Sequence, residues 1–339
     1  MEIDSAMEKR SGSLNVNFTG IARELGISVM TVYRVVNDLP CVRRETRVRV
    51  LEALNRHGYF THKPHKNLKV LFDFTEHAYL THYGTRLMHN IMKLNGLCYE
   101  CNHRKNRTAF LDAAAECDVA VFVSIPDAAV IEEARSVNPD LYTITISTRS
   151  SADVTLSPDN TRGGELAARH FHAMGHRHIA VHLSETHPTR MERYKAFFAE
   201  MKLLDPECRI DRIVERPDEP TVSALRNYFE SVDPFPTGIF FLAGAFAEVF
   251  LTEFSMNGPE KYKSLSVMTF DRPEDLEFTR LHYNFDRIEF ISPDLLDWAE
   301  YYITNRPMMK KRSPIHTTID VRLVVTGSVR RIDSSGATS

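Results

Sequence analysis

The fold of the first part of the chain is decided by the stretch Ile21-Ala22-Arg23-Glu24-Leu25-Gly26-Ile27-Ser28-Val29-Met30-Thr31-Val32-Tyr33-Arg34-Val35-Val36-Asn37. A helix-turn-helix needs a small residue where its two helices touch, and Ala22 meets that need. Its turn needs a residue that tolerates positive φ, and Gly26 is suited to it. Val32, Val35 and Val36 recur at helical spacing, so we expect them to bury one face of the second helix. The other face is then exposed at the helix start, where it can enter a DNA major groove.

The residues around this stretch complete a small helical domain. Asn17 is a good N-cap for a first helix, and Ser28 can cap the second. A third helix is expected over residues 46–57, with Val50 and Leu54 inward and Gly58 as its C-terminal stop. We therefore predict an all-α domain over residues 17–60, called the head below.

Charge is distributed unevenly along the chain. Between Asn17 and Asn67 nine basic residues face four acidic ones, a net charge of +5, whereas the whole chain carries −3. A basic head on an acidic remainder is typical of a protein whose head meets a polyanion. The alternative is an ordinary solvated surface, which charge alone does not exclude.

The same stretch resembles the signature of the LacI family of regulators, in which Gly-Val-Ser is followed by two variable residues and Thr-Val-Ser-Arg-Val-Leu-Asn. The resemblance implies that Val29, Met30 and Arg34 read base edges. Arginine pairs bidentately with guanine, and apolar side chains pack on thymine methyl groups. Tyr33 stands where the family has Ser, and we include it among the DNA-contacting residues.

The resemblance also implies a set of phosphate contacts, which fix register without reading sequence. We assign them to Ser28, Thr31, Asn37, Thr46 and Arg47. The connection that follows departs from the family. Residues 61–69 form a linker too short for a full hinge helix, Pro64 interrupts it, and we do not expect Leu68 to wedge into the minor groove.

Beyond the linker the pattern alternates between short apolar runs and helical periods. Such alternation indicates parallel sheets covered by helices, and two series of it indicate two lobes. Strands are expected at 70–74, 119–123, 141–146, 178–183 and 238–242, with another near Ile213, and helices at 83–94, 129–136, 163–174, 190–202 and 222–232. The fold class is thus α/β, with an all-α helix-turn-helix head and a two-lobed body that is like a periplasmic binding protein.

Domain boundaries follow from these patterns. Residues 1–16 and 331–339 are polar and expected to be disordered. The body spans 70–330 and serves effector binding and dimerisation. Its first lobe takes in about 70–157 and 286–310, and its second about 158–285 and 311–330.

Resemblance to the LacI family continues through the body. Asp159-Asn160-Thr161-Arg162-Gly163-Gly164 is similar to the family's Asp-Asn-x-x-Gly-Gly, Arg190 followed by Tyr194 to its Arg-x-x-Gly-Phe, and Phe270-Asp271 to its Phe-Asp. The resemblance implies that Asp159, Arg190 and Asp271 bind a small-molecule effector such as a sugar. After the strand at 238–242, however, the family has Ala-Asn-Asp, and this chain has Ala243-Gly244-Ala245, which removes polar groups from the expected ligand position.

Other kinds of site find little support. Cys98 and Cys101 with His103 have a metal-like spacing, but on a strand the two cysteines face opposite sides, and no second pair completes a tetrahedral site. The odd number of cysteines, five, fits free thiols. No nucleophile elbow or phosphate-binding glycine loop is present. We expect no metal, no cofactor and no enzymatic activity.

The sequence therefore predicts a cytoplasmic, homodimeric regulator that binds an operator in double-stranded DNA as a repressor or an activator, with repression the expected sign, and responds to an effector. One alternative is a solute-binding protein with a vestigial head. Another is a sugar-converting enzyme on the same scaffold, which needs a catalytic pair that the sequence does not offer.

Overall fold

The computed structural model describes residues 17–36, 42–57, 68–74, 78–123, 126, 128–146, 149–183, 188–216, 219–256, 258–271, 284–290, 292–306 and 314–332. The chain divides into two compact units, one containing the three head helices and the other containing nearly all of the body. The expected segment 1–16, the Gly58 helix stop and most of the linker, residues 61–67, lie outside the described residues.

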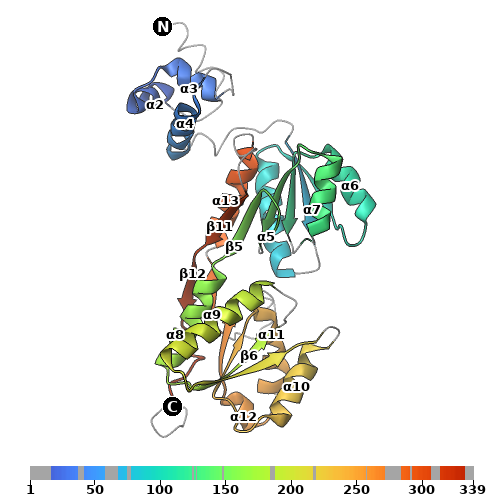
Figure 1. Ribbon diagram of the computed structural model, residues 1–339, viewed down its shortest axis with the longest axis vertical. Coiled ribbons are helices and arrows are strands. Elements are labelled where there is room, and N and C mark those ends of the chain that lie inside the picture. The colour runs from blue at the N-terminus through green and yellow to red at the C-terminus, as the bar shows by residue number, and fades with distance from the viewer. Residues whose placement is uncertain are drawn as a thin grey trace. The chain divides into compact units, whose positions relative to one another are not determined.

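Three helices make up the head, as predicted (Figure 1): α2 (Phe18–Leu25), α3 (Val29–Val36) and α4 (Arg44–Arg56). The Asn17 side chain accepts from the Gly20 amide at 2.8 Å and so caps α2. Gly26 ends α2 with a φ of 66°, the left-handed conformation that glycine adopts without strain. The buried core of the head consists of Ile21, Ala22, Val32, Val35, Val50, Ala53 and Leu54.

The first lobe of the body is built on a parallel sheet in the strand order β11-β5-β4-β3-β1-β2. Its strands are β1 (Lys69–Phe74), β2 (Leu97–Cys101), β3 (Val119–Val123), β4 (Tyr142–Ile146), β5 (Val154–Pro158) and β11 (Ile315–Ile319), and its helices are α5 (Ala78–Lys93), α6 (Arg107–Glu116), α7 (Ala128–Val137) and α13 (Ser292–Thr304). Phe122 packs with residues of α6 and α7. On the opposite face α5 approaches so closely that a Cβ on Gly84 would lie 2.4 Å from the Phe74 ring. The sheet is thus covered on both faces, as its continuous apolar strands require.

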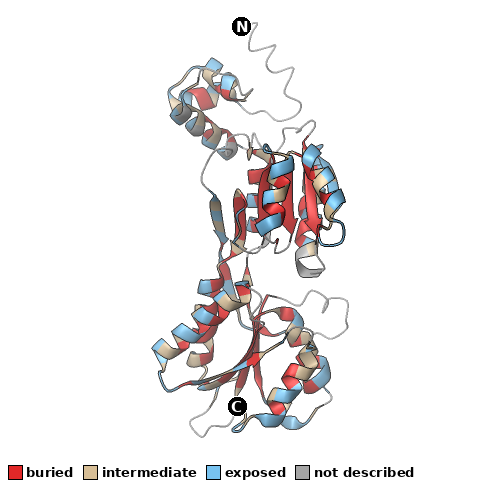
Figure 2. Cartoon of the chain, turned by 45° about the vertical axis from the view of Figure 1, so that its right-hand side comes forward, coloured by how far each residue is buried: buried red, intermediate tan, exposed pale blue. Residues whose placement is uncertain are grey.

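The second lobe repeats this plan in the order β12-β10-β9-β8-β6-β7. Its elements are α8 (Asn160–Ala173), β6 (His178–Leu183), α9 (Pro188–Leu204), β7 (Arg209–Val214), α10 (Thr221–Ser231), β8 (Gly238–Phe241), α11 (Gly244–Phe250), the π-helix η2 (Leu251–Ser255), α12 (Glu260–Lys263), β9 (Ser266–Phe270), β10 (Asp286–Phe290) and β12 (Val321–Val324). Only β12 runs antiparallel to its neighbour in the described sheet. Buried residues follow the strands of both lobes and the helix faces toward them (Figure 2).

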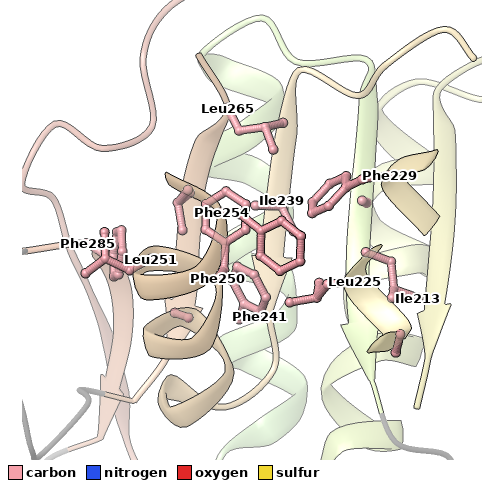
Figure 3. Close-up of a cluster of buried hydrophobic side chains, with 14 residues drawn as sticks. Ile213, Leu225, Phe229, Ile239, Phe241, Phe250, Leu251, Phe254, Leu265 and Phe285 are labelled. Carbon is pink, nitrogen blue, oxygen red and sulfur yellow. The ribbon is translucent and has the colours of Figure 1, made fainter. Parts of the chain in front are cut away.

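The core of the second lobe is rich in phenylalanine. Figure 3 shows Phe229 of α10 among side chains from β8, α11 and η2. Its ring centre lies 5.5 Å from that of Phe254 and 5.9 Å from that of Phe250. On the opposite face of the sheet, the ring centres of Phe197 of α9 and Phe240 lie 5.1 Å apart. Aromatic burial on both faces therefore fixes the helices that follow β6 and β8.

Two segments differ from the expected lobe boundaries. Residues 286–310 were expected in the first lobe, but β10 pairs with β9 and β12 in the second sheet. Residues 311–330 were expected in the second lobe, but β11 pairs with β5 in the first sheet. Residues 331 and 332 were expected in the disordered tail, but both are described, and the Ile332 amide donates to the Met174 carbonyl at 2.8 Å.

A buried carboxylate binds the segment that follows β12, residues 326–328, to the second sheet. Asp286 of β10 accepts hydrogen bonds from the amides of Thr326, Gly327 and Ser328. Its Oδ2 also forms a hydrogen bond of 2.7 Å with His170 Nε2. Burial alone would raise the pKa of Asp286, but these hydrogen bonds outweigh it and lower the pKa below its usual range. The Thr-Gly-Ser segment thus has a structural role.

Candidate functional site

The exposed face of α3 carries the residues expected to read bases. Met30 is 47% exposed and so presents an apolar surface on this face. Arg34 is exposed and makes no hydrogen bond or ion pair within the described part of the head. Val29 is half-buried beside the core of the head. This face therefore presents a cationic donor and an apolar surface side by side, the two kinds of group that recognise base edges.

The start of α3 is fixed by its own side chains. The Ser28 hydroxyl accepts from the Thr31 amide at 3.1 Å, and the two hydroxyls lie 2.8 Å apart. Ser28 is exposed and Thr31 half-buried. This cap places both hydroxyls at the N-terminus of a helix, where phosphate groups bind readily.

The remaining residues expected at the DNA are placed as follows. Tyr33 lies on α3, and Thr46 and Arg47 lie in the first turn of α4, all three half-buried. Asn37 lies outside the described residues. The Arg47 amide donates to the Arg43 carbonyl at 2.9 Å, which closes the first turn of α4.

Part of the basic charge of the head is structural, which the sequence did not reveal. Arg56 and His57 both contact the Glu24 carboxylate at 2.8 Å, and Arg49 donates to the Leu25 carbonyl at 3.1 Å. The His57 hydrogen bond is the main cause that lowers the pKa of Glu24. These contacts tie α4 to α2, and no sequence motif marks them because the partners are 24 or more residues apart.

Leu68 is not placed to wedge between bases. Its side chain is 2% exposed, and its carbonyl accepts from the Leu97 amide at 2.7 Å. This agrees with the expectation that the short linker does not supply an intercalating leucine.

The second candidate site lies at the carboxyl edge of the second sheet, where parallel α/β sheets bind ligands. Arg190 is in the first turn of α9, after β6, and Asp271 directly follows β9. Asp271 has a φ of 69°, which is uncommon for a residue other than glycine. Asp159 caps α8 by accepting from the Arg162 amide at 2.9 Å. The structure therefore gives Asp159 a capping contact and places Arg190 and Asp271 at the strand ends.

Arg193 contacts residues from several elements at this edge of the sheet. It was not among the site residues predicted from the sequence. It is 6% exposed and lies 3.5 Å over the Phe270 ring. Its guanidinium donates to Asn160 Oδ1 at 2.8 Å and the Leu242 carbonyl at 2.7 Å, and reaches Asp271 at 3.4 Å. A signal was present, since Arg193 occupies the glycine position of the Arg-x-x-Gly-Phe pattern.

Two glycines allow this arrangement. A Cβ on Gly164 would lie 2.5 Å from the Arg193 carbonyl oxygen, and a Cβ on Gly163 would lie 2.4 Å from the Phe270 ring. The Gly-Gly pair therefore lets α8 approach both α9 and the aromatic platform under Arg193.

Cys98 and His103 contact protein groups in the structure. Cys98 Sγ lies 3.7 Å from the Met88 carbonyl oxygen, and His103 Nδ1 lies 2.7 Å from the buried Asp73 carboxylate. No group of three or more metal-binding side chains occurs among residues that the structure describes.

Comparison with known proteins bears on the head first. Residues 18–62 match the model of the "Bacterial regulatory proteins, lacI family". Over 46 residues the chain is 48% identical to catabolite control protein A of Priestia megaterium, a match that covers 14% of each protein. The chain thus matches this curated relative over only a small part of its length.

The body resembles solved structures of the same kind. A LacI family transcriptional regulator from Enterococcus faecium with bound ribose aligns with a TM-score of 0.61 and 17% identity, covering 76% of this chain and 97% of that one. The lac repressor dimer bound to operator and an anti-inducer aligns with a TM-score of 0.60 and 15% identity, covering 91% and 98%. The predicted fold class is confirmed. The head thus matches the family model over residues 18–62, and the body has the fold of these solved regulators.

Proposed function

We propose that this protein is a sequence-specific DNA-binding transcriptional regulator. The observation that carries the proposal is the exposed face of α3, where Arg34 has no partner in the described head and Met30 is exposed. A helix that offers such a face and begins with a hydroxyl cap fits the major groove, with phosphates at its N-terminus. Val29, Met30 and Arg34 are assigned to bases, Ser28, Thr31, Asn37, Thr46 and Arg47 to phosphates, and Tyr33 to the DNA-contacting residues without a specified partner.

The proposal divides the work between the parts of the chain. Residues 17–60 bind the operator, and residues 61–69 link the head to the body. Residues 70–330 form the body, which binds a small-molecule effector and forms a homodimer. Two-fold symmetry of the dimer selects a near-palindromic operator. As the regulator of a bacterial gene, the protein works in the cytoplasm, and repression is the expected sign.

The effector site is proposed at Arg190 and Asp271, with Asp159 at the neighbouring helix start and Arg193 added from the structure. The regulator from Enterococcus faecium holds ribose, and a sugar or a related metabolite is the effector proposed here. Binding shifts the balance between two arrangements of the body, a coupling of about 1–3 kcal/mol between effector and DNA. The protein performs no chemistry on the effector.

A selection from random duplex DNA tests this function. The full chain is incubated with a library of 30-base-pair random inserts at about 0.15 M salt, and bound duplexes are amplified over successive rounds. We expect a consensus with two-fold symmetry, because each head of a dimer binds one half-site. Enrichment of no sequence over the starting library contradicts the proposal and favours a solute-binding protein with a vestigial head.

A further inference from the structure

Arg190 carries a positive charge that no described residue neutralises. Its guanidinium lies 4.5 Å from the centre of the Phe246 ring, on the first turn of α11. No hydrogen bond or ion pair joins it to any residue in the described ranges. Glu215 acts on Arg190 through space, but its carboxylate accepts from the Thr221 hydroxyl at 2.8 Å. A charge that is neither paired nor hydrogen-bonded is costly to keep largely out of water.

The electrostatic surroundings of Arg190 also lack a neutralising negative charge among the described residues. Burial, and then the charge of Arg193, lower the pKa of Arg190 to about 10, against the opposing effect of Glu215. Arg193 itself is accompanied by Asp271 at 3.4 Å. Of the two guanidinium groups at the edge, only Arg193 therefore has a carboxylate at ion-pair distance among described residues.

His182 is a second unsatisfied group beside the first. It lies near the carboxyl end of β6, is 0% exposed, and has its ring 4.5 Å from that of Phe246. Neither of its ring nitrogens has a hydrogen-bond partner within the described part of the chain. Burial, and then the charge of Arg190, lower its pKa to about 3, so the ring is neutral and offers one donor and one acceptor.

Two unsatisfied groups on one aromatic ring are unusual in a folded protein. Buried polar groups nearly always have partners, and an unpaired one costs about 1–3 kcal/mol. Phe246 is contacted by both Arg190 and His182. His182 lies on β6 and Arg190 follows β6, whereas Phe246 follows β8, the parallel neighbour of β6. Both groups thus belong to one edge of one sheet.

The surroundings disfavour a neutral polyol at this place. Hydroxyl groups of a sugar are held best by carboxylate and amide side chains that accept and donate. Gly244 and Ala245 begin α11 without such groups, and Asp271 already accompanies Arg193. What the edge offers instead is a guanidinium, a neutral imidazole and an aromatic face.

We propose that the effector of this site is an oxyanion, a small molecule whose carboxylate or phosphate group is bound by Arg190 over the Phe246 ring. Guanidinium groups bind both kinds of anion through paired N–H donors. His182 supplies a neutral donor to the same molecule. This inference rests on the proposed effector function of the body, and it narrows the effector class from sugars at large to acids or phosphate esters.

Thermal unfolding of the full chain without DNA tests the inference with simple anions. Sodium phosphate and sodium acetate are titrated to 50 mM at pH 7.5, with sodium chloride holding ionic strength constant. A ligand that binds the folded state raises the unfolding temperature by mass action. We expect at least one of the two anions to raise it above the chloride reference, and the stronger one identifies phosphate or carboxylate as the preferred group.

Variants assign the effect to Arg190. Arg190→Gln removes the charge and is expected to lose the increment, whereas Arg190→Lys is expected to keep part of it, which separates charge from packing. Arg226→Gln, on an exposed position of α10, removes one charge elsewhere and is expected to keep the whole increment. Equal increments in the wild-type chain and Arg190→Gln, or no increment with either anion, overturn the inference.

This result is independent of the DNA selection. Anion binding is measured on the full chain without DNA, and the selection is measured without added anions. A protein that selects a consensus but shows no anion increment refutes only the present inference, and the opposite pair of results refutes only the regulator proposal.

Discussion

Arg34 and Arg56 lie in the same small head but differ in their surroundings. Arg56 donates to Glu24 at 2.8 Å, whereas Arg34 has no such contact within the described head. Replacing Arg34 by Ala is therefore expected to remove a base contact without loosening the fold. We expect a loss of about 1–3 kcal/mol on the selected operator and little loss on random DNA. Competition binding with the two duplexes measures the difference.

The matched control for this variant is Arg226→Ala, which removes the same charge from an exposed position of the body. It is expected to bind both duplexes as the wild-type chain does. If Arg34→Ala weakens binding to operator and random DNA by the same factor, Arg34 contacts phosphates and its assignment to bases is wrong.

His176 makes the stability of the second lobe sensitive to acid. Its ring is buried between the Thr237 hydroxyl and the Arg330 carbonyl, at 2.8 and 3.0 Å. Burial lowers its pKa from 6.5 to about 4. The unfolded chain then binds a proton that the folded chain refuses between these two values, so stability is lost as pH falls through that window. The loss attributable to His176 is about 3 kcal/mol, since one pKa unit corresponds to about 1.4 kcal/mol.

Urea unfolding at pH 7 and at pH 4.5 measures this dependence. His176→Gln cannot take up the proton and is expected to lose less stability between the two pH values than the wild-type chain. The same decrease in both proteins would show that other groups are responsible.

Close contact between α8 and α9 depends on one glycine. A methyl group at position 164 would meet the backbone oxygen of Arg193 at 2.5 Å, and backbone cannot move aside as a flexible side chain does. Gly164→Ala is expected to destabilise the protein by about 1–3 kcal/mol through overpacking. Chemical denaturation checks the value. Thr161→Ala, on an exposed position of the same helix, is expected to change stability by less than about 0.5 kcal/mol. Equal effects of both substitutions contradict this account.

Phe229 lies at the centre of the aromatic core in Figure 3. Truncating it to Ala leaves a cavity among Phe250, Phe254 and Tyr262, which contact its ring. We expect a loss of about 3–5 kcal/mol in the free energy of unfolding. Phe198, which is 39% exposed on α9, provides the same substitution at a site where little burial is lost. A Phe198→Ala loss as large as that of Phe229→Ala would contradict the packing argument.

At the scale of the elements, sequence patterns located those with strong local signals. The buried runs at 119–123 and 178–183 are strands. The periodic stretch at 163–174 lies in α8 up to its C-cap, Met174, and the stretch at 190–202 lies within α9. Helix α6 was not predicted, because its run of alanines has little apolar periodicity. Strands β10 and β11 were not recognised either, since half of their residues are polar or charged and their partners are distant in sequence.

The candidate sites show the same limit. The helix-turn-helix pattern predicted α3, and resemblance to the LacI family pointed to Arg190 and Asp271, whose roles stay predictions. Neither could show that Arg193 donates to the Leu242 carbonyl 49 residues away, or that His182 has no partner among the described residues. Such contacts depend on long-range packing, which local patterns do not contain.

The whole molecule combines a head that matches a family model with a two-lobed body. The chain crosses between the two lobes three times. The chain passes from the first sheet to the second after β5, returns after β10, and passes again between β11 and β12. The sequence placed β10 in the first lobe and β11 in the second, and the strand pairing reverses these two assignments. Every described helix falls short of the length and apolar character needed to cross a lipid bilayer.

The central claim is that the head discriminates one DNA sequence from others. The most direct measurement is the ratio of the dissociation constants for the selected operator and a scrambled duplex of the same length and composition, at about 0.15 M salt. For a specific regulator we predict a ratio of at least about a thousandfold, with both affinities falling as salt rises. Equal affinity for the two duplexes would contradict the claim.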